Sequence, residues 1–263
     1  MYKKRERIKL LGIDIDNINM KETINKIELL IEKKKPSLVI TPNVHHINIL
    51  QKDNEFRKIY KHASLVIPDS TPLLWSSKIL GVPLKERVTG SDLLPLFSEV
   101  SAEKKYRLFF LGAKPGIAKK AAETLIQKNP RLEITGIYSP YFGFQNDGRE
   151  NRKIVDMIKK CDPDVLFICL GPPKQEKWAW KHKDKIKVPV IICVGAAFDF
   201  IAGNLKRAPK WMQKIGLEWF FRLCQEPHRL WKRYLIGNIV FIWLVLKEFI
   251  KKRFKFITLA KGK

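Results

Sequence analysis

The sequence predicts an α/β fold in which a parallel sheet is covered by helices on both faces. Three observations predict it: short apolar runs recur along the chain, amphipathic segments separate them, and a polar turn follows each run. The runs interpreted as strands are residues 37–40, 64–67, 106–111, 132–137, 164–170 and 188–194. This alternation of strands and helices is typical of parallel sheets with helices on both sides.

The individual elements follow in order along the chain. Residues 8–15 form an opening β-like stretch. Apolar residues at helical spacing then predict the first helix; they are Ile24, Ile27, Leu30 and Ile31. Residues 115–127 and 151–160 carry charges on one side and apolar residues on the other, as expected of helices that cover a sheet.

The polar turns after the strands are the candidate site. In open parallel sheets, ligands bind beyond the carboxyl ends of the strands. The turns in question are residues 41–43, 68–70, 112–116, 138–140, 171–176 and 195–199. We therefore expect these six turns to line one crevice.

Three of these turns suggest ligand binding, each with a simpler alternative. The segment 112–116, which begins and ends with glycine, can hold a phosphate on its backbone N–H groups, or it is only a strand-to-helix turn. The segment 171–176 is favoured as a binding turn, with the Gln175 amide and the Glu176 carboxylate aimed at the crevice. Asp199 either accepts hydrogen bonds from a nucleoside or caps a helix.

Asp69 is the candidate catalytic residue. It follows an apolar strand and Pro68, so its carboxylate should face the crevice, where it can act as a general base. The alternative is an aspartate that stabilises its own turn. Position alone does not separate the two.

No metal site is predicted. The five histidines form no spacing typical of metal ligands, and no D-x-D pair follows a strand. The adjacent His45 and His46 are interpreted as structural residues or substrate contacts. A diphosphate would therefore have to be neutralised by cations of the protein itself.

The C-terminal part of the chain supplies such cations. The whole chain has a formal net charge of +25, and residues 204–263 contain 15 Lys and Arg against 3 Asp and Glu, interleaved with aromatic residues. Residues 235–246 are almost wholly apolar, but a spanning helix needs about 20 such residues. We expect this run to lie in a membrane interface beside anionic headgroups, the alternative being a buried core helix.

The location expected for the protein is the cytoplasm. The N-terminal residues are basic but precede no apolar stretch long enough for a secretory signal. The four cysteines, Cys161, Cys169, Cys193 and Cys224, form no C-x-x-C pair and are interpreted as buried thiols in a reducing compartment.

Several motifs in the right order resemble the WecG/TagA/CpsF glycosyltransferases (glycosyltransferase family 26), from about Ile13 to Lys247. The motifs are Thr41-Pro-Asn43, Pro68-Asp69-Ser-Thr-Pro-Leu-Leu-Trp75, Gly81-x-Pro83-x-x-x-Arg87-Val-x-Gly90-Ser-Asp92-Leu, Gly171-x-Pro-Lys-Gln-Glu176-x-Trp178, Gly195-Ala-Ala-Phe-Asp199-x-x-x-Gly203, Arg207-Ala-Pro209, Gly216-Leu-Glu218-Trp219-x-x-Arg222-Leu and Glu226-Pro227-x-Arg229-Leu-x-x-Arg233-Tyr234. One departure is Ser70, where the family's usual pattern has Gly.

The resemblance implies a Rossmann-like catalytic core, assigned to residues 1–203, and a helical, basic, membrane-associating appendage, assigned to residues 204–263. It implies a hexosyltransferase that inverts the anomeric carbon, a UDP-sugar donor and an undecaprenyl-diphosphate-linked sugar acceptor. The transferred sugar would be N-acetylmannosamine or a related hexose or uronic acid, for cell-surface polysaccharide or teichoic acid. No cofactor and no metal are expected, and the enzyme would lie on the inner face of the cell membrane.

This resemblance also assigns roles to residues. Asp69 would be the base, with Arg222 and Arg229 stabilising the departing diphosphate. The substrate-binding residues would be Thr41, Asn43, Arg87, Gln175, Asp199 and Arg233, with Asp199 on the nucleoside.

Two other functions remain open from the sequence. The charge and the aromatic-rich basic tail also suit a nucleic-acid-binding protein, although the interfacial apolar run argues against it and no nucleic acid is expected as a partner. A dinucleotide-dependent enzyme is disfavoured, because no G-x-G-x-x-G follows an early strand.

Overall fold

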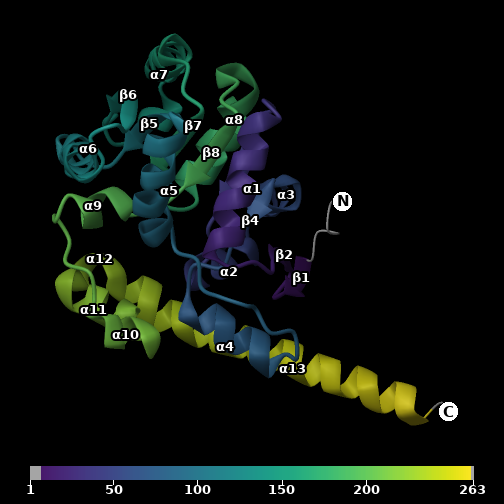
Figure 1. The fold of residues 1–263 in the computed structure, drawn as a ribbon. Helices are drawn as coiled ribbons and strands as arrows, with labels where there is room; N and C mark the ends of the chain where they lie inside the picture. The colour runs from purple at the N-terminus through teal and green to yellow at the C-terminus, as the bar shows by residue number, and fades with distance from the viewer. Residues whose placement is uncertain (1–6, 262–263) are drawn as a thin grey trace.

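The computed structural model describes residues 7–261, with side chains described as far as Phe254 (Figure 1). Residues 1–6 of the first predicted domain and residues 262–263 of the second lie outside the described residues. The opening β-like stretch is an antiparallel hairpin of β1 (Arg7–Leu10) and β2 (Ile13–Asp16). Its turn needs left-handed backbone at Leu11 and Gly12, with φ of 48° and 87°.

A six-stranded parallel sheet forms the centre of the molecule, as predicted. Its strands are β3 (Ser37–Ile40), β4 (Leu65–Val66), β5 (Arg107–Gly112), β6 (Glu133–Tyr138), β7 (Val165–Cys169) and β8 (Val190–Cys193). Their order in the sheet is β4-β3-β8-β7-β5-β6, and every neighbouring pair is parallel. All carboxyl ends therefore meet at one edge.

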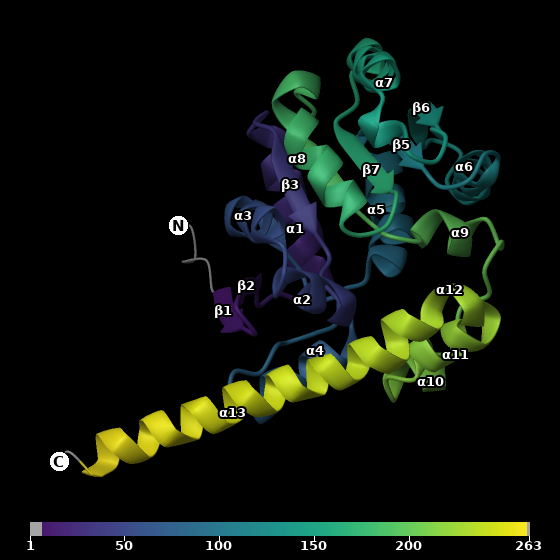
Figure 2. The same ribbon diagram turned by 180° about the vertical axis from the view of Figure 1, so that it is seen from behind.

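Helices cover both faces of the sheet, which confirms the predicted fold class (Figures 1 and 2). One face packs on α1 (Met20–Glu32), α5 (Gly90–Lys104), α6 (Ile117–Lys128) and α9 (Ala197–Ile201). The other packs on α2 (Val44–Leu50), α3 (Asn54–His62), α7 (Gly148–Cys161) and α8 (Lys174–Ile186).

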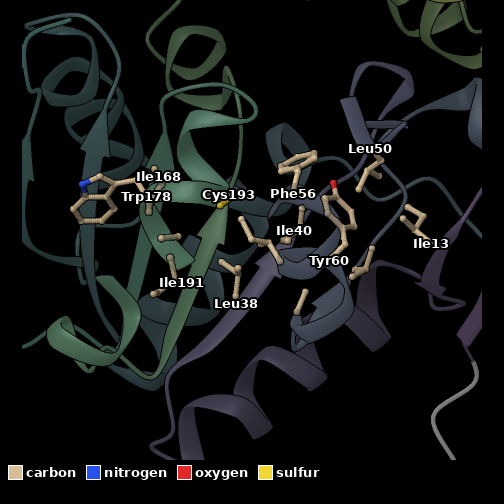
Figure 3. Close-up of a cluster of buried hydrophobic side chains, with 14 of the residues drawn as sticks. Ile13, Leu38, Ile40, Leu50, Phe56, Tyr60, Ile168, Trp178, Ile191 and Cys193 are labelled. Atoms are coloured by element: carbon tan, nitrogen blue, oxygen red, sulfur yellow. The ribbon is translucent and has the colours of Figure 1, made fainter. Parts of the chain in front are cut away.

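Side chains alternate between the two faces along each strand, because successive side chains of a strand point to opposite sides. On β8, Ile191 and Cys193 join one core cluster, shown in Figure 3, while Val190 and Ile192 join the other. Burying an aliphatic side chain of this size contributes about 1.5–3 kcal/mol. The two clusters hold the sheet rigid behind the turns at its carboxyl edge.

The C-terminal segment crosses the molecule beneath this edge (Figure 2). It consists of α10 (Lys210–Lys214), α11 (Glu218–Gln225), α12 (Pro227–Trp231), the π-helical turn η2 (Lys232–Ile236) and α13 (Gly237–Lys261). Helix α13 passes α2, where Asn48 Nδ2 donates to the Gly237 carbonyl at 2.8 Å. It then passes α4 (Thr71–Ile79), beyond which Lys252 Nζ donates to the Leu80 carbonyl at 3.0 Å.

The apolar run of α13 is divided between two environments. Phe241 and Val245, one helical turn apart, are buried in the core cluster on the α2 side of the sheet. The exposed apolar side chains of the helix are Ile239, Val240, Ile242, Trp243, Leu246, Ile250 and Phe254. Within residues 7–261, no helix combines the length and apolarity needed to cross a bilayer.

Candidate functional site

A cavity of about 650 Å³ lies between the carboxyl ends of the strands and the C-terminal segment. Residues from all six predicted turns line it: Thr41, Asn43, Asp69, Ser70, Ala113, Lys114, Pro115, Pro140, Gly171, Pro172, Lys174, Gln175, Gly195, Ala196 and Asp199. The expectation of one shared crevice is confirmed. The C-terminal segment closes the opposite wall with Glu218, Trp219, Arg222, Glu226, Arg229, Arg233 and Tyr234.

Asp69 stands in the cavity wall just beyond β4, partly exposed to the cavity. Its carboxylate accepts the backbone N–H of Gly90 at the start of α5, so it is held by another segment. Burial raises the pKa of Asp69 to about 8; the negative charge of Glu218 acts in the same direction, while Arg87 and Arg207 oppose it. A carboxyl with this pKa can exchange a proton near neutral pH.

Ser70 does not disturb the position of the Asp69 carboxylate. Its φ of −160° is ordinary extended backbone, which residues with a side chain adopt freely. Ser70 is the N-cap residue of α4, yet its side chain makes no capping hydrogen bond, and its Oγ is buried without a partner. The departure from glycine at this position is therefore compatible with the position of Asp69.

Three arginines of the C-terminal segment reach the cavity. The Nε atoms of Arg222 and Arg233 are buried without a hydrogen-bond partner, whereas Arg229 Nε donates to Glu226 Oε1 at 2.8 Å. Burial lowers the pKa of Arg233, and the charges of Arg222 and Arg229 act in the same direction. Buried donors without partners beside like charges are typical of an anion site.

Thr41, Asn43 and Gln175 hold the turns in place. Thr41 Oγ1 donates to the Cys193 carbonyl at 3.0 Å, and Asn43 caps α2 by accepting the N–H of His45 at 3.0 Å. Gln175 is buried, and its Oε1 accepts the N–H groups of Gly171 and Gly195, both at 3.2 Å. These side chains fix the backbone of the turns that line the cavity, and so determine its shape.

The prediction that the Glu176 carboxylate faces the crevice is wrong. Glu176 is fully buried and lies beneath the site, where Oε1 contacts His46 Nε2 at 3.2 Å and accepts from Gln175 Nε2 at 2.7 Å. Its place in the first turn of α8 points the side chain towards α2. Both histidines line the cavity, but the ring of His46 is held by Asn43 and Glu176, so His46 is interpreted as structural. Burial lowers the pKa of His45 to about 3.

Asp199 lines the cavity from the first turn of α9. Because the N-cap of this helix is Ala196, Asp199 is not the cap residue. Its Oδ1 accepts from Asn204 Nδ2 at 2.9 Å. Nearby, Gly112, the last residue of β5, has a φ of 112°, and a Cβ there would clash with the Cys169 carbonyl oxygen, so the end of β5 approaches β7 more closely than a side chain allows.

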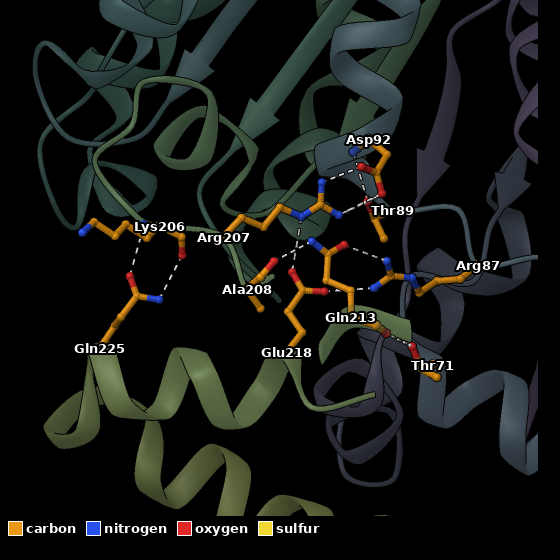
Figure 4. Close-up of polar contacts among 10 residues, drawn as sticks. All are labelled: Thr71, Arg87, Thr89, Asp92, Lys206, Arg207, Ala208, Gln213, Glu218 and Gln225. Atoms are coloured by element: carbon orange, nitrogen blue, oxygen red, sulfur yellow. Dashed lines mark hydrogen bonds and ion pairs between the residues drawn. The ribbon is translucent and has the colours of Figure 1, made fainter. Parts of the chain in front are cut away.

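Arg87 lies in the cavity wall, but its guanidinium is hydrogen-bonded to other side chains of the protein (Figure 4). It donates to Glu218 Oε2 at 2.9 Å and to Gln213 Oε1 at 3.2 Å. Arg207 is held by Asp92, with Nη2 2.8 Å from Oδ2. The sequence motifs contain Glu218, Arg207 and Asp92, but the sequence analysis assigned them no role. Glu218 and Arg87 are 131 positions apart, and Arg207 and Asp92 are 115 apart, so no local spacing signals these contacts.

Among the described residues, Cys169 is the cysteine that lines the cavity. No group of three or more His, Cys, Asp and Glu that could hold a metal occurs in the described part of the chain. Cys169 and Cys193 are buried as expected and Cys161 is half-buried, whereas Cys224 is exposed, so the buried-thiol prediction is wrong for Cys224.

The comparisons with known proteins agree with one another. Residues 8–255 match the family model described as "Glycosyl transferase WecG/TagA/CpsF family". A relative from Bacillus subtilis (strain 168) is 29% identical over 90% of this chain and 91% of its own length. Another, from Staphylococcus aureus (strain MW2), is 26% identical over 95% and 94%. Both are named N-acetylglucosaminyldiphosphoundecaprenol N-acetyl-beta-D-mannosaminyltransferase.

Proposed function

The chain belongs to the WecG/TagA/CpsF family of glycosyltransferases, and we propose that it transfers a sugar from a UDP-sugar to an undecaprenyl-diphosphate-linked sugar. The transferred sugar is N-acetylmannosamine or a related hexose or uronic acid, and the product enters teichoic acid or another cell-surface polysaccharide. The names of the relatives support this choice of substrates. Family membership also favours this function over the nucleic-acid and dinucleotide alternatives.

One observation carries the proposal: a carboxyl group of raised pKa, Asp69, shares a cavity with Arg222 and Arg233, whose buried Nε atoms have no hydrogen-bond partner. Asp69 takes the proton from the acceptor hydroxyl as the oxygen forms a bond to C1 of the donor sugar. The bond from C1 to the UDP oxygen breaks, and UDP leaves with the electron pair. A single displacement of this kind inverts C1.

The arginines stabilise the charge that develops on the departing diphosphate. Arg222 and Arg233 have buried Nε donors without a partner, and Arg229 joins them once it leaves Glu226. Fixed donors aimed at developing charge contribute about 3–4 kcal/mol each in enzymes that stabilise an oxyanion. In this proposal they act where other transferases use a divalent metal.

The remaining cavity residues position the two substrates. Asp199 and the loop 112–116 hold the nucleoside diphosphate, with the N-terminus of α6 directed at its charge. Thr41, Asn43 and Gln175 act through the turns that they fix. Small displacements of such turns cost about 100-fold in rate.

The C-terminal segment is proposed to rest on the anionic inner face of the cell membrane, where a lipid-linked acceptor is anchored. Helix α13 exposes a row of apolar side chains, including Trp243, and basic residues flank this row. Aromatic and aliphatic side chains beside lysines are the pattern of an interfacial helix. The exposed apolar face supports the proposal, since it has no protein covering.

A donor panel tests the function. Purified protein is incubated with UDP-sugars and a short-chain lipid-diphosphate sugar, and the product is read by mass spectrometry. Asp69→Asn should lower kcat by about 10²–10⁴-fold, as expected for loss of a general base. The matched control is Asp184→Asn on the exposed side of α8, which should leave kcat unchanged. Undiminished turnover by Asp69→Asn would contradict the assignment of the base.

A further inference from the structure

We propose that Glu218 is a positioning residue, which anchors α11 to the core through Arg87 and Arg207 and so fixes Arg222 and the charges around Asp69. The inference rests on the proposed function, because that function gives Asp69 and Arg222 their roles. We name the network of these side chains the Glu218 latch; it consists of Arg87, Asp92, Arg207, Gln213 and Glu218 (Figure 4).

The latch joins three separate parts of the chain at one carboxylate. Glu218 Oε2 accepts from Arg87 Nη1 at 2.9 Å, and Oε1 lies 3.5 Å from Arg207 Nε. Arg87 belongs to the segment between α4 and α5, Arg207 to the linker after α9, and Glu218 is the first residue of α11. Each oxygen therefore faces a different guanidinium, and the helix is tied at its start.

Gln213 and Asp92 complete the network. Gln213 accepts from Arg87 Nη2 at 3.2 Å and donates to the Ala208 carbonyl at 2.8 Å, while its own carbonyl accepts from Thr71 Oγ1 at 3.2 Å. Asp92 holds Arg207 with both oxygens. The contacts thus continue from α10 to the N-termini of α4 and α5.

Partial burial makes these contacts stronger than ordinary surface pairs. The side chains of Arg87, Arg207 and Glu218 are exposed by only 19%, 24% and 23%. Burial acts to raise the pKa of Asp92, yet hydrogen bonds from Arg207 and Thr89 outweigh it and leave the pKa below its ordinary value. Charged pairs that are hydrogen-bonded and partly desolvated hold geometry better than exposed pairs, which contribute little.

The latch reaches both groups that the proposed reaction needs. Thr89, the N-cap of α5, contacts Asp92 and Arg207, and the next residue, Gly90, donates its N–H to Asp69. On the other side, Glu218 and Arg222 are four residues apart and share one face of α11. The anchored helix therefore brings Arg222 into the cavity that holds Asp69.

The charges that face Asp69 come from several elements. Glu218 is the anionic one, the cations are Arg87, Arg207 and Arg233, and the neutral ionisable neighbour is Tyr60. Removing the charge of Glu218 takes away a repulsion and leaves Arg87 and Arg207 uncompensated. Both changes favour the ionised form of Asp69.

A double-mutant cycle between Arg87→Met and Glu218→Gln tests the latch, with melting temperature and kcat/KM as readouts. Measured on the plateau above the acidic limb, where Asp69 is ionised, each single change should lower kcat/KM by about tenfold, and the double variant should lose no more than either single variant, because they break the same contact. If Arg87 instead binds substrate independently of Glu218, the two losses multiply to about 100-fold. That multiplication, together with additive shifts in melting temperature, overturns the proposal.

The pH dependence of kcat/KM is a second test, because the loss of a purely structural contact would leave it unchanged. In Glu218→Gln the acidic limb of kcat/KM should shift to lower pH by about half to one unit, as expected for one nearby charge in a partly buried site. The matched control, Glu123→Gln, removes an exposed partner of Lys119 on α6 and should not shift it. An unmoved limb in Glu218→Gln contradicts the proposal.

Failure of the latch and failure of the proposed function are distinguishable. If no UDP-sugar is turned over, the function is wrong, while the melting temperatures still report whether Arg87 and Glu218 are coupled. If transfer occurs but the cycle is additive in both readouts, the function stands and the latch is wrong.

Discussion

Asp69 is the residue whose chemistry is most sensitive to pH. Because burial raises its pKa to about 8, the carboxyl is largely protonated at neutral pH in the free enzyme and must lose this proton before it acts as a base. We expect kcat/KM to rise with pH and to level off above about 8, since kcat/KM reports ionisations of the free enzyme. A profile that is flat from pH 6 to 9 would contradict Asp69 as the base.

The same ionisation affects stability, which gives a control that needs no substrate. The pKa of Asp69 is higher in the folded protein than the ordinary value of 3.8, so its ionisation costs folding free energy as pH rises from about 4 to above 8. Asp69→Asn avoids this cost. Its melting temperature should therefore exceed that of the wild type at pH 9, and the difference should shrink towards pH 4.

At the scale of residues, the sequence predicted which residues lie near the cavity better than it predicted which way their side chains point. It placed Asp69 and Asp199 correctly, because the turn after a parallel strand must lie at the carboxyl edge. It misplaced Glu176, because a one-residue step along α8 turns a side chain by about 100° and only packing decides which one faces the cavity. It could not show that Arg87 is bound by Glu218, a residue 131 positions away.

Among the elements, the end of β5 shows how a backbone conformation depends on glycine. Gly112→Ala should destabilise the protein by about 1–3 kcal/mol, because its Cβ would meet the Cys169 carbonyl and its φ of 112° disfavours a side chain. Chemical denaturation measures the difference. Gly148→Ala at the start of α7 is the control, since its Cβ meets only Arg152 Nη1 at 4.0 Å. Equal stability of the two variants would show that the close approach is not required.

Regular elements were the most predictable part of the fold. All six parallel strands were predicted within a few residues, because each is a short apolar run bounded by polar turns. The hairpin of β1 and β2 was not separated into two strands: Gly12 is a turn signal, but Leu11, whose φ is 48°, is apolar and continues the run of apolar residues. The strand order was also beyond the sequence pattern, since pairing between distant segments leaves no local trace.

The whole molecule combines a core with a C-terminal segment that both completes the cavity and presents an apolar surface. The division into domains of residues 1–203 and 204–263 stays a prediction, and Phe241 and Val245 of α13 are buried among core side chains. The core-helix interpretation of the apolar run therefore holds for Phe241 and Val245, whereas the membrane-interface interpretation stays a prediction. One side of α13 packs into the core, and the other side exposes apolar side chains.

This exposed side leads to the last prediction, that the protein binds anionic membranes through α13. Wild-type protein should co-sediment with phosphatidylcholine vesicles that contain phosphatidylglycerol, and less so at high salt, because each nearby Lys or Arg contributes about 1 kcal/mol that salt screens. Trp243→Glu should weaken binding at least tenfold, since it puts a charge in the apolar face. Ile126→Glu, on exposed α6 of the core, is the control and should bind like the wild type. If wild-type protein stays in the supernatant with anionic vesicles, or if Ile126→Glu weakens binding as much as Trp243→Glu, α13 is not the membrane-binding element.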